Sequence, residues 1–138
     1  MIYLDTSAFV KLVWREDESA ALEHFLTERD DGQLVSSALL AVEARRAVLR
    51  EDASQLPRSD LLLSRVGQVA ITGAVVESAS RLPDPALRSL GAIHLATALL
   101  LGREVDVLVS YDKRLCAAAQ AHGIPAVGPA IGPAAGSG

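Results

Sequence analysis

The sequence predicts an α/β fold with three layers, in which a central, mostly parallel sheet is flanked by helices on both faces. Two observations support this prediction. Short apolar segments alternate with longer helical ones, and the apolar segments at 2–5 and 105–109 are each closed by polar residues. Strands that alternate with helices form parallel sheets that are covered on both sides. Ligands bind such sheets beyond the carboxyl ends of the strands.

The chain has 138 residues, which is enough for one domain with a buried core and too few for two. We expect this domain to cover residues 1–127. Residues 128–138 are rich in Gly, Pro and Ala and have little to bury, so they predict a mobile tail.

Composition excludes several classes of protein. No run of 18 apolar residues occurs, so no membrane span is expected. The first residues have neither a basic start nor a long apolar stretch, which argues against a secretory signal. The single cysteine, Cys116, is too few for an internal disulfide or a thiolate metal cluster and fits a reducing compartment. We therefore expect a soluble, cytoplasmic protein.

The first half of the chain begins with a buried strand at 2–5 that ends in Asp-Thr-Ser, a typical start of a following helix. Phe9, Leu12 and Val13 recur at helical spacing and predict that helix. The elements expected next are a helix at 18–28, a turn at 30–32, a strand at 34–35, a helix to about residue 50 capped by Ser36 and Ser37, a helix at 57–66, a strand at 69–71 and a helix at 72–82.

The second half contains a clear start signal. Asp84 followed by Pro85 predicts a helix that lasts to Leu101 and is ended by Gly102, because Asp is a favoured N-cap and Pro a favoured first helical residue. The elements expected after it are a strand at 105–109, a helix at 113–121 and a short strand at 126–127.

Three acidic residues follow or accompany these elements. Asp5 ends the first strand and Asp112 lies just beyond the strand at 105–109, so both are expected at one edge of the sheet. Glu43 lies beside the apolar stripe of its helix, where an unpaired carboxylate is costly and needs a basic partner or a shared cation. Each acid also has an ordinary structural interpretation: Asp5 as a helix N-cap, Asp112 as a turn residue, and Glu43 as a solvated neighbour of Arg46.

Four local strings strengthen the functional interpretation. They lie at residues 3–8, 37–43, 93–98 and 109–112, and they occur in the order found in PIN domains. Over residues 1 to about 127 the chain resembles PIN-domain ribonucleases, and VapC-type toxins of type II toxin–antitoxin systems in particular.

This resemblance implies a PIN-like fold and an endoribonuclease in which Asp5, Glu43 and Asp112 hold Mg²⁺ or Mn²⁺ and catalyse RNA cleavage. Carboxylate oxygens are the ligands that such hard cations prefer. The resemblance also implies an RNA substrate, a homodimer and a VapB-type antitoxin that covers the acidic groove.

Gly91 departs from the family pattern, which carries a further Asp at this position. The missing acid predicts a weakened second metal position, whether the glycine is natural or introduced. The alternative is therefore a catalytically inactive PIN-like module that binds antitoxin or RNA. A phosphohydrolase with Asp5 as nucleophile is disfavoured, because no Asp stands two residues later as partner acid.

Other polar residues near the acids have open roles. His94 lies one turn beyond Gly91, and we interpret it as a structurally satisfied helix histidine. The hydroxyls of Thr6 and Ser110 either support the carboxylates or cap the following helices. A net charge of −4 argues against nucleic-acid binding. Basic residues that could contact RNA nevertheless accompany each acid: Lys11, Arg15, Arg45, Arg46, Arg50, Lys113 and Arg114.

Overall fold

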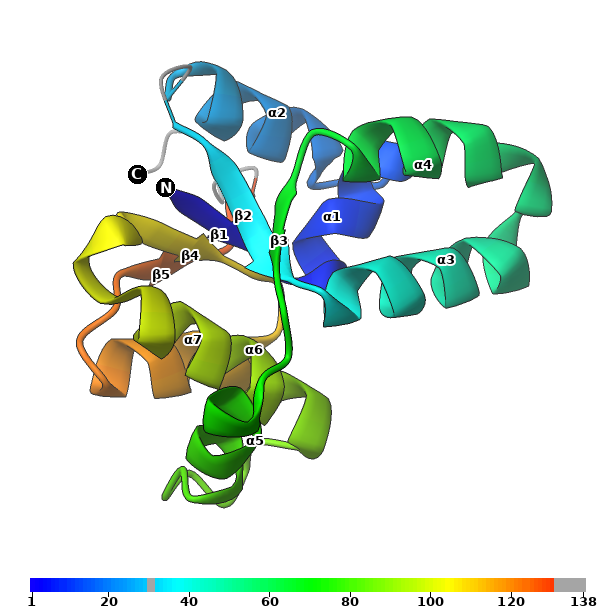
Figure 1. Ribbon diagram of the computed structural model, residues 1–138. Coiled ribbons are helices and arrows are strands. Elements are labelled where there is room, and N and C mark those ends of the chain that lie inside the picture. Colours follow the sequence, from blue (N-terminus) through cyan, green and yellow to red (C-terminus); the bar gives the residue numbers. More distant parts are fainter. Residues whose placement is uncertain (30–31, 131–138) are drawn as a thin grey trace.

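A computed structural model describes residues 1–29 and 32–130 of the chain. These residues form one parallel sheet in the order β3-β2-β1-β4-β5, with β1 at its centre (Figure 1). The strands are β1 Ile2–Leu4, β2 Leu34–Ser37, β3 Gly67–Val69, β4 Val107–Val109 and β5 Ala126–Val127.

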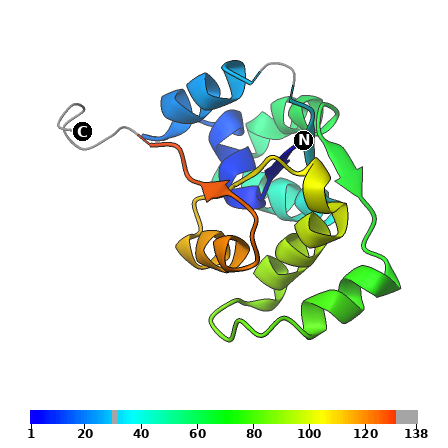
Figure 2. The same ribbon diagram turned by 90° about the vertical axis from the view of Figure 1, so that its left-hand side faces the viewer.

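Helices cover both faces of this sheet. They are α1 Thr6–Val13, α2 Ser19–Thr27, α3 Leu39–Glu51, α4 Leu56–Leu63, α5 Gly73–Ser80, α6 Ser89–Leu101 and α7 Lys113–Ala121, with short 3₁₀ turns at Ala53–Gln55 and Gly102–Glu104. The turned view in Figure 2 shows α2 (blue) on one side of the sheet and α6 and α7 (yellow-green and orange) on the other. The predicted three-layer α/β architecture is confirmed.

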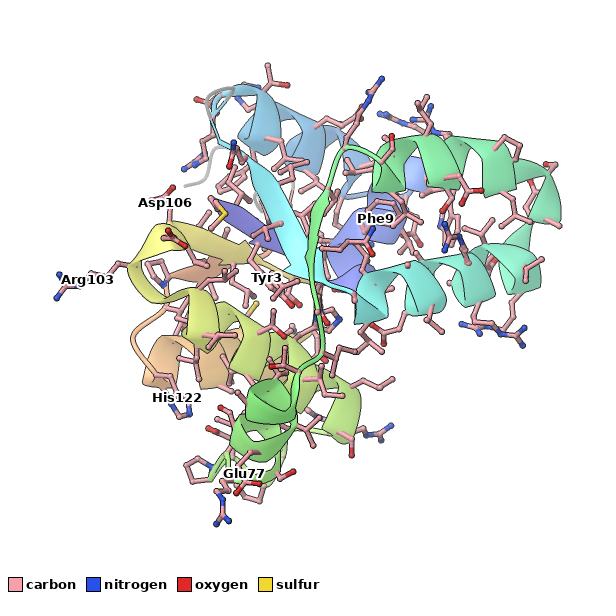
Figure 3. All side chains as sticks on the ribbon, viewed as in Figure 1. Tyr3, Phe9, Glu77, Arg103, Asp106 and His122 are labelled. Carbon is pink, nitrogen blue, oxygen red and sulfur yellow. The ribbon has the colours of Figure 1, made fainter. Side chains whose placement is uncertain are left out.

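The central strand explains the layers, because successive side chains of a strand point to opposite faces. Ile2 and Leu4 pack into a buried cluster with residues of α1 and α2, whereas Tyr3 packs into a second cluster with residues of α6 and α7. A third cluster, which contains Phe9, joins α1 to α3 and α4. Figure 3 labels Tyr3 and Phe9 on their different sides of the molecule.

Several predicted boundaries agree with the structure. The helix at 113–121 and the strand at 126–127 have the predicted limits. Helix α6 ends at Leu101, as predicted, because Gly102 has a φ of +59°, a backbone angle that residues other than Gly rarely adopt.

The predicted start of that helix was wrong. Helix α6 begins at Ser89, not at Pro85, and the preceding residues form a turn in which Leu87 N donates to Asp84 O over 3.0 Å. The carboxylate of Asp84 lies 2.8 Å from Nε2 of His122, at the end of α7, and does not cap a helix. The predicted helix start depended on the side chain of Asp84 as an N-cap. This side chain instead contacts His122, which lies 38 positions further along the chain.

Of the two serines predicted to cap the next helix, Ser36 does not, whereas Ser37 does accept a hydrogen bond from the first N–H group of that helix. Ser36 and Ser37 extend β2, and Ser36 Oγ donates to the carbonyl of Leu4 over 2.6 Å on the neighbouring strand. Helix α3 starts at Leu39, whose N–H donates to Ser37 Oγ over 3.1 Å. The strand expected at 69–71 lies two residues earlier.

The end of the chain is described only in part. Tyr111 donates its hydroxyl hydrogen to the carbonyl of Pro129, so this residue of the predicted tail is held against the domain. Residues 131–138 of that tail, and residues 30 and 31 of the predicted turn, lie outside the described residues. Among the helices of the described part, none is both long and apolar enough to cross a bilayer.

Candidate active site

The site begins where two neighbouring parallel strands end. Leu4 of β1 pairs with Val109 of β4, so the next residues, Asp5 and Ser110, lie side by side at the carboxyl edge of the sheet. Ser110 Oγ donates to Asp5 Oδ2 over 2.6 Å. The predicted position of Asp5 is thus confirmed, and so is its capping role, because Asp5 Oδ1 accepts hydrogen bonds from Ala8 N at 3.0 Å and from Ser7 Oγ at 2.7 Å.

All three predicted acids line one pocket of about 450 Å³. Asp5 comes from the junction of β1 with α1, Glu43 from α3, and Asp112 from the junction of β4 with α7. Segments far apart in the sequence therefore converge here. The full set of residues that line the pocket is Asp5, Thr6, Ser7, Glu43, Arg88, Ser89, Leu90, Gly91, His94, Asp112 and Leu115.

Glu43 is held by two donors that bind the same oxygen. Thr6 Oγ1 donates to Glu43 Oε1 over 2.6 Å, and His94 Nε2 lies 2.9 Å from the same atom. Partial burial would raise the pKa of Glu43, but these two hydrogen bonds outweigh it and hold the pKa below its ordinary value. Glu43 is therefore ionised at neutral pH, and Thr6 supports this carboxylate.

Asp112 is tied to the backbone of the helix that follows it. Its Oδ1 accepts hydrogen bonds from Arg114 N at 2.9 Å and from Leu115 N at 3.3 Å, which makes Asp112 the N-cap of α7. The sequence analysis interpreted Asp112 as a turn residue, and the structure shows it as a helix cap directly after a strand. Its second oxygen, Oδ2, accepts no hydrogen bond from the described residues.

The three acids have little compensating positive charge. In residues 1–29 and 32–130, no Lys or Arg side chain forms an ion pair with any of them. Asp5 is only 5% exposed, and burial raises its pKa even though hydrogen bonds from Ser110 and Ser7 act in the opposite direction. An ionised carboxylate in such a place calls for a cation.

The donor set fits a hydrated divalent ion. Within the described chain, no three His, Cys, Asp or Glu side chains lie close enough together to enclose an ion by themselves. Mg²⁺ usually keeps several waters and takes only one or two protein carboxylates. A pocket of about 450 Å³ has room for those waters. Glu43 Oε2 and Asp112 Oδ2, which accept no hydrogen bond from the described residues, are the oxygens best placed to contribute.

Gly91 lines the same pocket, so the position where the family pattern carries an acid belongs to the site. A Cβ atom at residue 91 would lie 2.9 Å from Cδ1 and 3.5 Å from Cγ of Leu87. Because the nearer atom is the end of a flexible side chain, a larger residue fits if Leu87 changes rotamer.

The sequence interpretation missed Arg88. This residue lines the pocket and precedes α6, but the predicted helix started too early and placed it in a helix interior. Its side chain makes no hydrogen bond or ion pair with other described residues. No capping side chain marks the true start, because the N-cap position is held by Arg88, which makes no capping hydrogen bond. The basic residues expected to accompany the acids do not line this pocket.

Comparison with known proteins decides the family. The sequence profile of the PIN domain matches residues 2–121, most of the chain. This chain belongs to the PIN-domain family. The resemblance drawn from the four local strings is confirmed.

The relatives of this PIN-domain protein cover nearly its whole length. It is 43% identical to ribonuclease VapC35 of Mycobacterium tuberculosis over 131 residues, which are 94% of this chain and 97% of the relative. It is 40% identical to ribonuclease VapC46 of the same organism over 128 residues, or 93% and 97% of the two chains.

A solved structure supports the fold independently. The crystal structure of VapC20 from Mycobacterium tuberculosis, described as a toxin that cleaves the sarcin-ricin loop, matches with a TM-score of 0.74. The match covers 94% of this chain and 100% of the other, at 15% sequence identity. The predicted PIN-like fold is therefore confirmed.

The buried charge of Asp5 generates a prediction about stability. Because its pKa is raised in the folded protein, ionised Asp5 destabilises the fold above that pKa, and the penalty disappears as the pH falls through it. We expect Asp5→Asn, measured with a chelator at pH 7, to raise the melting temperature by about 3 °C, the effect of about 1 kcal/mol. The difference from wild type should shrink as the pH is lowered.

Thermal unfolding followed by circular dichroism measures this effect, with Asp17→Asn, which changes an exposed acid, as the matched control. Mn²⁺ should raise the melting temperature of the wild type more than that of Asp5→Asn, since the variant offers the ion one carboxylate fewer beside Glu43 and Asp112. A lower melting temperature for Asp5→Asn at pH 7 would contradict the penalty assigned to this charge.

Proposed function

We propose that this PIN-domain protein is a Mg²⁺- or Mn²⁺-dependent endoribonuclease that acts as the toxin of a type II toxin–antitoxin pair. One observation carries the proposal: Asp5, Glu43 and Asp112 converge on a single pocket at the carboxyl edge of the sheet. The names of its relatives, which are VapC ribonucleases, support the same class of activity.

The residues of the pocket have distinct roles in this proposal. Ser7 and Ser110 hold Asp5, and Thr6 holds Glu43, so the carboxylates keep their positions before any ligand arrives. The divalent ion, when bound, would offset the charge of the phosphodiester and activate a water molecule for its hydrolysis. Preorganised acids lower the cost of binding that ion.

Arg88 is the basic residue that lines the pocket, and we assign to it a contact with an RNA phosphate. A guanidinium group donates two parallel hydrogen bonds to phosphate oxygens, which positions the backbone without reading the base. Lys113 and Arg114 line a neighbouring pocket beside Leu87 and extend the basic surface next to the acids. This local arrangement offsets the unfavourable net charge of −4.

The activity itself is the first test. We expect the wild type to cleave single-stranded RNA with Mg²⁺ or Mn²⁺ and to lose cleavage when a chelator is added. Asp112→Asn should lower the rate by more than about 100-fold, because even outer contacts of a metal site are worth 10- to 100-fold. Asp17→Asn is again the matched control. Cleavage that persists in a chelator would contradict metal dependence.

The alternative function is a catalytically inactive PIN-like module that binds antitoxin or RNA. The observation in its favour is Gly91, which brings no carboxylate to the pocket. The same position supplies a direct test, because an acid can be restored there if Leu87 moves.

We expect Gly91→Asp to raise cleavage by about 10-fold or more in Mn²⁺, since one added carboxylate strengthens metal binding by that order. Gly91→Asn is the matched control, with the same crowding against Leu87 and no charge. The readout is the initial rate on a fluorescent RNA. Cleavage seen only with Gly91→Asp would favour the inactive module, and equal rates for the Asp and Asn variants would rule out a role for an acid at this position.

The proposed partner is a VapB-type antitoxin. The uncompensated carboxylates of the pocket would pair well with a cationic side chain, which could take the place of the metal ion. The homodimer and the cytoplasmic location expected from the sequence belong to the same proposal.

We expect an antitoxin encoded with this protein to block cleavage on binding. Glu43→Gln should weaken the complex by about 10-fold, because an interface charge pair is worth at least 1.4 kcal/mol. Titration of the purified complex with Mn²⁺ should compete with the partner. A partner that binds equally well to Glu43→Gln and leaves cleavage unchanged would contradict this mode of inhibition.

A further inference from the structure

A chain of hydrogen bonds runs from the centre of the sheet to the pocket. The Tyr3 hydroxyl lies 2.8 Å from Nδ1 of His94, and Nε2 of His94 lies 2.9 Å from Oε1 of Glu43. The Tyr3 ring meets the His94 ring edge to face, with a centroid distance of 5.8 Å and an interplanar angle of 83°. Both contacts fix the plane and the rotation of the imidazole.

The direction of the donors follows from the chemistry of each group. The Tyr3 hydroxyl carries a hydrogen and lies within hydrogen-bond distance of Nδ1 of His94, so it donates to that nitrogen. Nδ1 is then the acceptor of the ring, and Nε2 carries the hydrogen that is donated to Glu43. Both ring nitrogens of His94 therefore have hydrogen-bond partners, as the sequence analysis expected. One of these partners, Glu43, belongs to the candidate site.

The two oxygens of Glu43 consequently differ. Oε1 accepts from both Thr6 and His94, whereas Oε2 accepts from no group in residues 1–29 and 32–130. Two donors on one oxygen restrict the rotation of the carboxylate. The oxygen without a donor is therefore held in one place, where the wall of the pocket includes Glu43.

We propose that His94, anchored by Tyr3, is a positioning residue that holds Oε1 of Glu43 and thereby presents Oε2 to a divalent cation in the pocket. This inference rests on the proposed metal-dependent function. The position of Glu43 matters more in this chain than in one with an acid at position 91, because Gly91 leaves the pocket with one carboxylate fewer to hold a cation. Removing a group that orients a metal ligand typically lowers the affinity for the metal by about 10- to 100-fold.

The test measures Mn²⁺ binding to the full-length chain by calorimetry, without RNA. We expect His94→Leu to weaken Mn²⁺ binding by about 10-fold or more, and His94→Gln to restore most of it, because the amide can donate to Glu43. Leu95→Ala is the matched control: this neighbouring residue of α6 is fully buried, so its truncation destabilises the fold without removing a donor from Glu43.

Tyr3 is tested by a double-mutant cycle. Tyr3→Phe keeps the ring and removes only the hydroxyl, and we expect Mn²⁺ binding about 5-fold weaker than wild type. Because Tyr3 acts through His94, the same change should have no further effect in the His94→Leu background. Additive losses in the two backgrounds would overturn the anchoring role of Tyr3.

A spectroscopic readout distinguishes positioning from mere packing. Long-range ¹H–¹⁵N correlation of the His94 ring should show hydrogen on Nε2. A neutral ring with its hydrogen on Nδ1 would overturn the proposal, since that tautomer cannot donate to Glu43. So would Mn²⁺ affinity in His94→Leu equal to that of the wild type, or a loss in Leu95→Ala as large as in His94→Leu.

The failure of the underlying function has a different signature. A wild-type chain that binds no Mn²⁺ would overturn both the metal-dependent function and the role assigned to His94. Wild-type binding that survives every change at Tyr3 and His94, but is lost in Asp112→Asn, would overturn the role of His94 alone.

Discussion

The parallel pairing of β1 with β4 is the constraint on which the site depends. With Leu4 opposite Val109, the residues that follow both strands must share one edge of the sheet, and the Ser110 hydroxyl reaches the Asp5 carboxylate. A register shifted by one residue would turn the side chains after one of the strands to the opposite face. The pocket is thus a product of sheet geometry first and of side-chain chemistry second.

Much of the architecture could be predicted because it is encoded locally. The limits of α7, the final strand and the stop at Gly102 follow from apolar spacing and from one backbone angle. The start of α6 could not be predicted, because the carboxylate of Asp84 contacts His122, the residue after α7, and does not cap a helix. Ser36 failed as a cap for a similar reason, since its hydroxyl bonds to the neighbouring strand.

Asp5 and Asp112 were predictable from their places after strands, and all three acids from the family strings. The sequence left Thr6 and Ser110 as supports or as caps, but it did not show which carboxylate each one holds. The donors to Glu43 come from Thr6 and His94, which are 37 and 51 positions away in the sequence. No periodicity links such residues, and the choice between a packed and a site-directed histidine needs coordinates. Arg88 was missed as well, because its place in the pocket depends on where α6 begins.

The double duty of two acids restricts how this protein can change during evolution. Asp5 and Asp112 are the N-caps of α1 and α7, so replacing either acid by a residue that cannot cap, such as Ala, would also weaken a helix, typically by about 1 kcal/mol. Residue 91 lies inside α6 and caps nothing. An acid at position 91 can therefore be lost without removing a helix cap, so among the acidic positions of the site this one can change at the least cost to the fold.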